Sequence, residues 1–175
     1  MLTHIAMTLI ARAERRLGVT LDYTRKIAAT DIRLLLRYNK IFGFLDPNTK
    51  VPPLAYHTAR LRGALAADCG TCVEAEINLA RGAGLTSDQI DAVLAARYDD
   101  LPADIAAVAV LADAVTAHRV DASEARTRII ETYGHEGLIE LSYAMNGAAL
   151  LPGIKRAMGY ATACDLTLLR ATTKA

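Results

Sequence analysis

The chain has 175 residues, of which 53% are hydrophobic, 22% are charged and 5% are aromatic, and its formal net charge is +1. This length is typical of one domain with its own core, so stability requires neither disulfide bridges nor a structural metal. The balanced charge, without a basic stripe, argues against nucleic acid as a partner. No apolar stretch approaches the roughly 18 residues of a membrane span, so we expect no membrane partner.

Helical periodicity covers the first half of the chain. Apolar residues recur at helical spacing over 2–17 and over 21–44. The first of these segments loosely resembles a signal peptide, but no basic residue precedes its short apolar run, so we expect a helix of the mature domain. Prolines within 46–53 predict a loop, and further helices are expected over about 54–67 and 68–82.

Helix starts are well marked in the second half. Thr86 with Gln89, and Asp121 with Glu124, have the spacing of capping boxes. Pro102 falls in the expected first turn of the helix between them. These signals predict helices that begin near each of the three positions.

The remaining sequence also favours helix. The helix after Asp121 should stop at Gly134, residues 136–150 should continue as helix, and Pro152 should open a last one that contains Cys164 as a buried core residue. We therefore predict an all-α, single-domain bundle of about seven to nine helices, with residues 1–45 forming its N-terminal helices.

Two of the three cysteines, Cys69 and Cys72, form a C-x-x-C motif. On a helix they are i, i+3 neighbours, with Cα atoms roughly 5–6 Å apart, which is within disulfide range. A disulfide closing so small a loop adds little stability, so chemistry is a better explanation for the pair than support of the fold. So few cysteines indicate a reducing compartment, and we expect a cytoplasmic protein.

Three neighbours could tune these thiols. Asp68 is a candidate N-cap, which would place Cys69 in the first turn, where the helix dipole favours a thiolate. Glu76 lies four residues after Cys72, on the same face. His57 is on the preceding helix, and an antiparallel hairpin would bring it beside Glu76, where the two side chains would form a proton relay.

Two other interpretations of the pair remain open. Both cysteines could be small buried hydrophobic residues. Alternatively, Cys69, Cys72, His57 and Glu76 could supply four ligands to a structural zinc ion, although such sites usually contain two ligand pairs. The motif alone does not exclude either.

The motif and its surroundings resemble the AhpD-like alkylhydroperoxidase family of the carboxymuconolactone decarboxylase superfamily. Members have a glutamate, a C-x-x-C twelve residues later, and a histidine four residues after the second cysteine. Here "VEAEINLARGAGLTSDQIDAVL" follows the cysteines, and the resemblance covers roughly residues 50–160. The glutamate and histidine are exchanged, since His57 stands upstream and Glu76 downstream. Thr71 also stands where some members have another histidine.

The resemblance implies an all-α thiol-dependent peroxidase or disulfide reductase that needs no cofactor or metal. It implies that Cys72 is the peroxidatic cysteine and that Cys69 resolves the resulting sulfenic acid. Helix-dipole reasoning instead favours Cys69 as the more acidic thiol. We follow the family order because Glu76 is in register with Cys72.

The resemblance also implies partners. The substrate would be a peroxide, and the electrons would come from a dithiol protein, either lipoyl-bearing or thioredoxin-like. Members form homo-oligomers, commonly trimers or hexamers. The alternative functions are a carboxymuconolactone-decarboxylase-type enzyme, whose chemistry does not need the cysteine pair, and a non-catalytic zinc-binding or structural oligomer.

Overall fold

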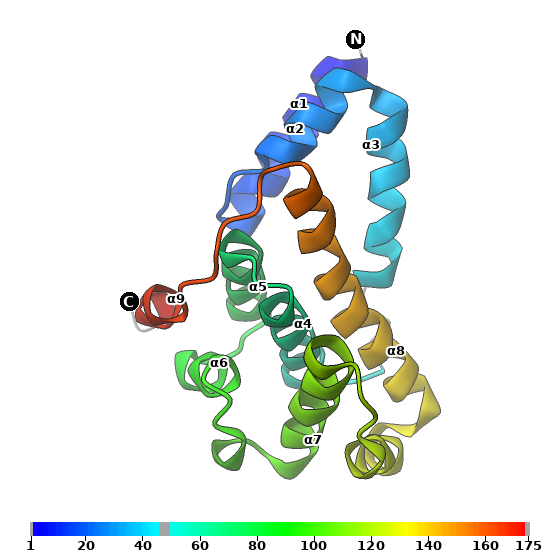
Figure 1. Ribbon diagram of the computed structural model, residues 1–175, viewed down its shortest axis with the longest axis vertical. Helices are drawn as coiled ribbons and strands as arrows, with labels where there is room; N and C mark the ends of the chain where they lie inside the picture. The colour runs from blue at the N-terminus through cyan, green and yellow to red at the C-terminus, as the bar shows by residue number, and fades with distance from the viewer. Residues whose placement is uncertain (1, 46–49, 174–175) are drawn as a thin grey trace.

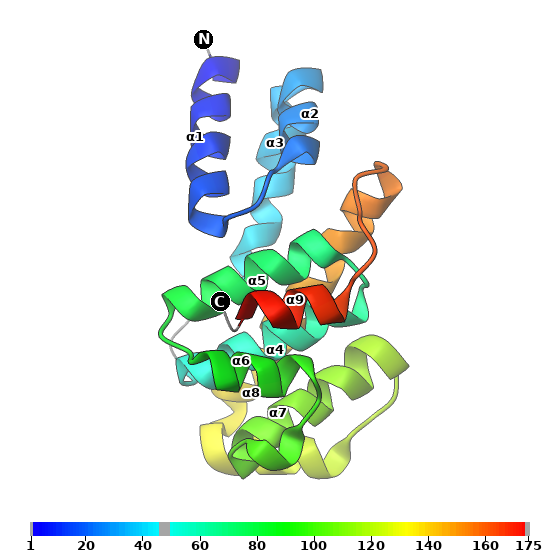
Figure 2. The same cartoon turned by 90° about the vertical axis from the view of Figure 1, so that its left-hand side faces the viewer.

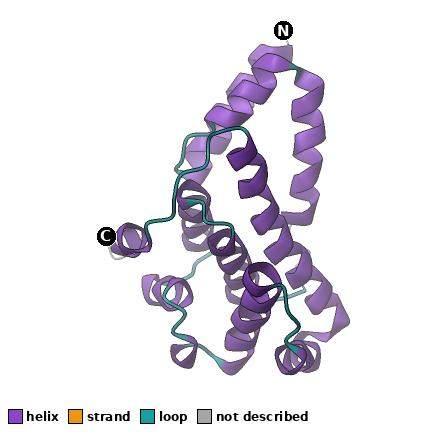
Figure 3. Ribbon diagram, in the orientation of Figure 1, coloured by secondary structure: helices purple, strands orange, loops and turns teal. Residues whose placement is uncertain are grey.

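A computed structural model describes residues 2–45 and 50–173, and within these ranges all regular secondary structure is helical, without a strand (Figure 3). This confirms the all-α prediction. None of the described helices is long and apolar enough to cross a membrane. The helices are α1 (Leu2–Leu17), α2 (Asp22–Thr30), α3 (Ile32–Asn39), η1 (Lys40–Leu45), α4 (Pro53–Ala66), α5 (Gly70–Gly82), α6 (Ser87–Leu94), η2 (Tyr98–Asp100), α7 (Ala103–Ala112), the π-helix η3 (Asp113–His118), α8 (Ser123–Ala157) and α9 (Leu166–Thr173).

The helices form two regions with separate hydrophobic cores. Helices α1 to α3 form an N-terminal unit, residues 2–39, which projects from the body, residues 50–173 (Figures 1 and 2). The core of the body joins α4 to α8 and extends to Leu169 of α9. The smaller core of the N-terminal unit includes Ile10, Tyr23 and Tyr38, and it packs against the last turns of α8.

Helix α4 lies at the centre of the body and is buried around most of its circumference. It packs against α5, α7 and α8. Gly63 permits the close crossing with α8, because a Cβ built there would lie 2.1 Å from the carbonyl oxygen of Met145. The small side chains of α4 thus let its backbone approach α8 closely.

Several expectations for the first half of the chain are confirmed. Residues 2–17 form α1, and α4 and α5 match the two helices expected around the cysteines. The helix expected over 21–44 is wrong in one respect, because Asp31 interrupts it. Its backbone is extended, and its side chain caps α3 by accepting a hydrogen bond from the Arg33 N–H at 2.8 Å. Residues 46–49, within the expected loop, lie outside the described ranges.

The helix starts of the second half have mixed outcomes. Thr86 and Gln89 form the predicted capping box, and Pro102 is the residue just before α7. The box at Asp121 and Glu124 is wrong, because Ala122 is the residue that precedes α8 and it caps nothing with its side chain. The Asp121 carboxylate is instead engaged by Arg126.

The C-terminal part also differs from its prediction. Gly134 leaves the helical conformation as expected, with φ +70°, and kinks α8. Pro152 does not open a helix but lies buried inside α8, where core packing outweighs the lost N–H. The helix instead ends at Ala157, and Gly159 follows with φ +80°. The Tyr160 N–H donates to the Lys155 carbonyl, as in a Schellman motif. Residues 158–165 therefore connect α8 to α9.

Candidate functional site

The cysteine pair lies at the N-terminus of α5. Cys69 and Cys72 are joined as a disulfide, with their Cα atoms 5.2 Å apart. Cys69 is the N-cap residue, in an extended conformation, and Cys72 is the third residue of the helix. Both sulfur atoms therefore belong to the first turn, where the helix dipole favours negative charge. The predicted disulfide proximity is confirmed.

Asp68 is not the N-cap of α5. It ends the preceding helix, with φ +48°, in the left-handed conformation that Asp and Asn tolerate better than most residues. Its N–H donates to the Leu65 carbonyl at 3.0 Å. The helix consequently begins two residues later than expected, which moves Cys72 into the first turn as well.

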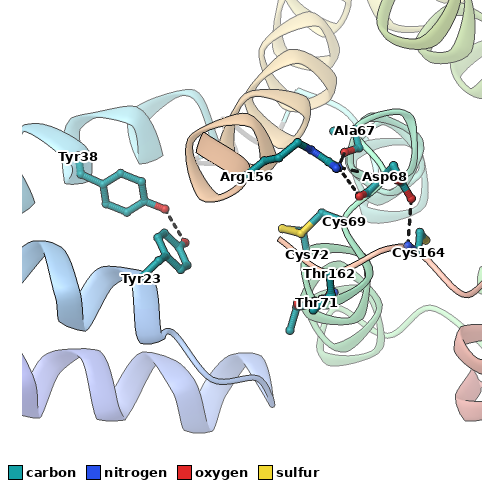
Figure 4. The surroundings of a disulfide bond; sticks show 10 residues. All are labelled: Tyr23, Tyr38, Ala67, Asp68, Cys69, Thr71, Cys72, Arg156, Thr162 and Cys164. Atoms are coloured by element: carbon teal, nitrogen blue, oxygen red, sulfur yellow. Dashed lines mark hydrogen bonds and ion pairs between the residues drawn. A yellow bond between two sulfur atoms is a disulfide. The ribbon is translucent and has the colours of Figure 1, made fainter. Parts of the chain in front are cut away.

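The connection from α8 to α9 is bonded to the start of α5, and we call residues 160–165 the strap. The Gly70 N–H donates to the Thr162 carbonyl at 3.1 Å, and the hydroxyls of Thr71 and Thr162 are 3.0 Å apart. The Cys164 N–H donates to the Asp68 carboxylate at 2.9 Å. Figure 4 shows Asp68, Thr71, Thr162 and Cys164 around the disulfide.

The two cysteines differ in accessibility. Cys69 is fully buried beneath the strap, with 0% exposure. Cys72 is partly exposed and lines a cavity. Gly70 allows the strap to lie close to the start of α5, because a Cβ at that position would lie 2.7 Å from the Ala163 carbonyl oxygen. A molecule in the cavity can therefore reach Cys72 but not Cys69.

The cavity has a volume of about 1210 Å³ and separates the N-terminal unit from the body. Its lining is mostly apolar, with Leu9 from α1, Leu36 from α3 and Phe42 from η1 among the contributors. A large, mainly apolar cavity with a few polar groups is the usual form of a small-molecule site. The polar groups include His57, Arg60, Glu76 and Lys155.

Glu76 is paired with arginine rather than with His57. Its two carboxylate oxygens accept hydrogen bonds from Nε and Nη2 of Arg60, at 2.7 and 2.8 Å. Both side chains are buried. Nη1 of Arg60 also donates to the Leu45 carbonyl at 3.1 Å. The expected His57–Glu76 hydrogen bond is not formed, because a buried carboxylate is stabilised more by a bidentate guanidinium than by a neutral imidazole.

His57 lines the same cavity from α4 and is mostly buried. Its Nδ1 atom has no hydrogen-bond partner in the described part of the chain. Burial, assisted by the positive charge of Arg60, lowers the pKa of His57 to about 4. The imidazole is therefore neutral at physiological pH and retains a lone pair that can accept a proton.

Three of the expected site residues, His57, Cys72 and Glu76, thus line one cavity, and Cys69 is bonded to Cys72 behind its wall. His57 and Glu76 do not form the expected relay. Because both carboxylate oxygens of Glu76 accept hydrogen bonds from Arg60, Glu76 is not placed to bind a zinc ion together with the cysteines and His57. Within residues 2–45 and 50–173, no group of three His, Cys, Asp or Glu side chains is placed to hold a metal ion.

Cys164 lies in the strap ahead of α9 and is half-buried, so its placement in a core helix was wrong. Burial, with the nearby Asp68 and Asp165 carboxylates, raises the pKa of the Cys164 thiol. A raised pKa makes this thiol a poor nucleophile at neutral pH.

Sequence reasoning overlooked Arg60 and Thr162. Arg60 had a detectable signal, since it follows His57 by three residues and so shares its helix face. Gly159 also signalled the end of α8 and hence the strap. No local pattern marks Thr162, which is 91 residues from Thr71.

Comparisons with family models, with curated proteins and with solved structures found no match to this chain. The resemblance to AhpD-like proteins therefore depends on the cysteine motif and its helical surroundings.

Proposed function

We propose that this protein is a thiol-dependent peroxidase, or disulfide reductase, that uses Cys69 and Cys72 as its redox pair. One observation carries the proposal: two cysteines at disulfide distance begin a helix, and only Cys72 opens into a large apolar cavity. A disulfide spanning three residues contributes little to stability. Its placement at a cavity is what a reaction with a small molecule requires.

The reaction begins with the Cys72 thiolate. It attacks the terminal oxygen of a hydroperoxide, the O–O bond breaks, and Cys72 becomes a sulfenic acid while the alcohol leaves with the proton lost by the thiol. The Cys69 thiol then attacks the Cys72 sulfur, which forms the disulfide and releases water. An external dithiol restores both thiols and is itself oxidised to a disulfide.

The neighbouring groups have separate roles in this scheme. The N-terminus of α5 stabilises the Cys72 thiolate. His57, in the same cavity, is kept neutral by its low pKa, so it transfers the thiol proton to the departing alkoxide in one step and does not hold it. Glu76 acts indirectly, since it fixes the Arg60 guanidinium in the cavity wall. The relay thus consists of His57 alone, with Glu76 as a positioning residue.

The reductant is a dithiol protein, lipoyl-bearing or thioredoxin-like, in a reducing compartment such as the cytoplasm. Because Cys69 is buried, the incoming thiol attacks Cys72, the accessible sulfur. Assembly into a trimer or hexamer would cover apolar residues such as Ile139 and Leu150, which are 51% exposed in the single chain.

The test begins with the reduced protein and one equivalent of cumene hydroperoxide. Wild type should form the Cys69–Cys72 disulfide, and Cys72→Ser should not consume peroxide. Cys69→Ser should stop at a sulfenic acid, which dimedone traps at Cys72 and mass spectrometry locates. Cys164→Ser is the matched control and should behave as wild type. Peroxide consumption by Cys72→Ser at the wild-type rate would reject the mechanism.

A further inference from the structure

Lys155 is a cation in the cavity wall that forms no ion pair with any described residue. It is only 6% exposed, and it lines the cavity from the last turns of α8. Its Nζ atom lies over the ring of Tyr23, 5.6 Å from the centroid. Burial lowers the pKa of Lys155, whereas the charge of Asp22, which lies too far away to form an ion pair, raises it. An ammonium that faces a mainly apolar cavity without an ion-pair partner favours an anion beside it.

Two tyrosines supply a hydrogen-bond donor next to this ammonium. The Tyr23 and Tyr38 hydroxyls are 2.6 Å apart, and both side chains are buried in the cavity wall. Figure 4 shows the two hydroxyls facing each other, near the disulfide. One hydroxyl proton forms the bond between them, which leaves the second proton for another acceptor. The site thus offers an ammonium and an O–H, which suit a carboxylate.

The rest of the cavity indicates what is attached to that carboxylate. Among the described residues, its charged lining consists of three cations, Arg16, Arg60 and Lys155, and one carboxylate, Glu76, which Arg60 neutralises. Its volume of about 1210 Å³ exceeds the roughly 300–1,000 Å³ of sites for drug-sized ligands. Ile5 and Leu9, which line it from α1, remain 52% and 60% exposed. A long apolar chain would cover them.

We propose that this cavity binds a long-chain carboxylic acid, with its carboxylate at Lys155 and the Tyr23–Tyr38 pair and its alkyl chain along α1 and α3. The carboxylate site is independent of the cysteine chemistry. The extension to catalysis rests on the proposed function: the hydroperoxide of such an acid would be the substrate, and its O–O group would reach Cys72 in the same cavity.

Binding of dodecanoate, measured by isothermal titration calorimetry below its micellar concentration, tests the carboxylate site. Lys155→Met, which retains the length of the side chain, should weaken binding at least tenfold, since a charge-assisted contact is lost. Lys155→Arg should retain most of the affinity, and Lys26→Met, an exposed lysine on α2 outside the lining, should bind as wild type. Equal affinity of Lys155→Met and wild type would overturn the proposal.

A second probe separates charge recognition from apolar binding. Dodecyltrimethylammonium has the same tail with the opposite head charge, and wild type should bind it at least tenfold more weakly than dodecanoate. Dodecanoate should also slow alkylation of Cys72 by iodoacetamide in the reduced protein. Equal binding of the two probes would contradict the proposal, as would a self-associated protein that binds neither because a second copy fills the cavity.

The Cys72→Ser variant distinguishes this inference from the proposed function. It should bind dodecanoate as wild type while losing peroxide consumption. Dodecanoate binding by a wild-type protein that does not react with cumene hydroperoxide would reject only the peroxidase function. Rapid reaction with cumene hydroperoxide, without dodecanoate binding, would reject only the carboxylate site.

Discussion

The body has a much larger buried hydrophobic core than the N-terminal unit. In the body, Leu61, Val73 and Leu141 are completely buried around α4. In the N-terminal unit, α1 and α3 leave Leu9 and Leu36 about 60% exposed, and both line the cavity. The body is therefore a closely packed support for the cysteine pair, and the N-terminal unit is a partly packed cover for the cavity. Substitutions should cost much more stability in the body.

The largest effect should follow from breaking the buried Arg60–Glu76 pair. Arg60→Met leaves the Glu76 carboxylate buried without its partner, so the free energy of unfolding should fall by about 3–5 kcal/mol, measured with urea. Combining it with Glu76→Leu should recover most of that loss. Glu136→Gln, in the exposed pair with Lys50, is the control and should cost less than about 1 kcal/mol. If Arg60→Met and Glu136→Gln lowered the free energy of unfolding equally, burial would not be what makes the Arg60–Glu76 pair important.

Acid should destabilise the protein through His57. Its pKa of about 4 in the folded state lies below the ordinary value of 6.5, so the unfolded state binds more protons between these values. Stability should be fully present above pH 6.5 and should fall by about 3 kcal/mol as the pH drops to 4. His57→Gln should remove this part of the pH dependence, whereas His4→Gln, at an exposed position, should retain it. An unchanged profile in His57→Gln would show that His57 is not held neutral by the fold.

Glycine substitutions compare the body with η1, the segment that follows the N-terminal unit, using the same change of side chain. Gly63→Ala should cost about 1–3 kcal/mol, because its Cβ meets the Met145 carbonyl and forces α4 from α8. Gly43→Ala, in η1 beside the N-terminal unit, places its Cβ within 4 Å of none of the described neighbours and should leave the thermal midpoint nearly unchanged. Similar losses at both positions would show that the crossing of α4 and α8 is less close than described.

The smallest effect should come from the exposed face of α1. Leu9→Gln should change the free energy of unfolding by no more than about 0.5 kcal/mol, because Leu9 is 60% exposed. The same variant should weaken dodecanoate binding, since Leu9 lines the cavity. A loss of more than about 1 kcal/mol in urea would indicate that another surface covers this residue.

Local features of the fold were predictable because they depend on residues close in sequence. The Thr86–Gln89 capping box and the break at Gly134 each involve contacts or backbone preferences within one helical turn. The same holds for the end of α8 just before Gly159, although the predicted boundary was at Pro152. Asp121 was misjudged because an aspartate near a helix start can pair with Arg126 instead of capping the backbone.

The sequence by itself determined the helical class and a cysteine pair that can close, because the spacing of three residues fixes the Cα separation on one helical turn. Tertiary structure decided the rest of the site. Glu76 pairs with Arg60, 16 residues away, because a buried carboxylate needs a charged partner. Cys69 is covered because the strap, about 90 residues further along the chain, bonds to the start of α5. Only the folded chain therefore distinguishes the accessible cysteine from the buried one.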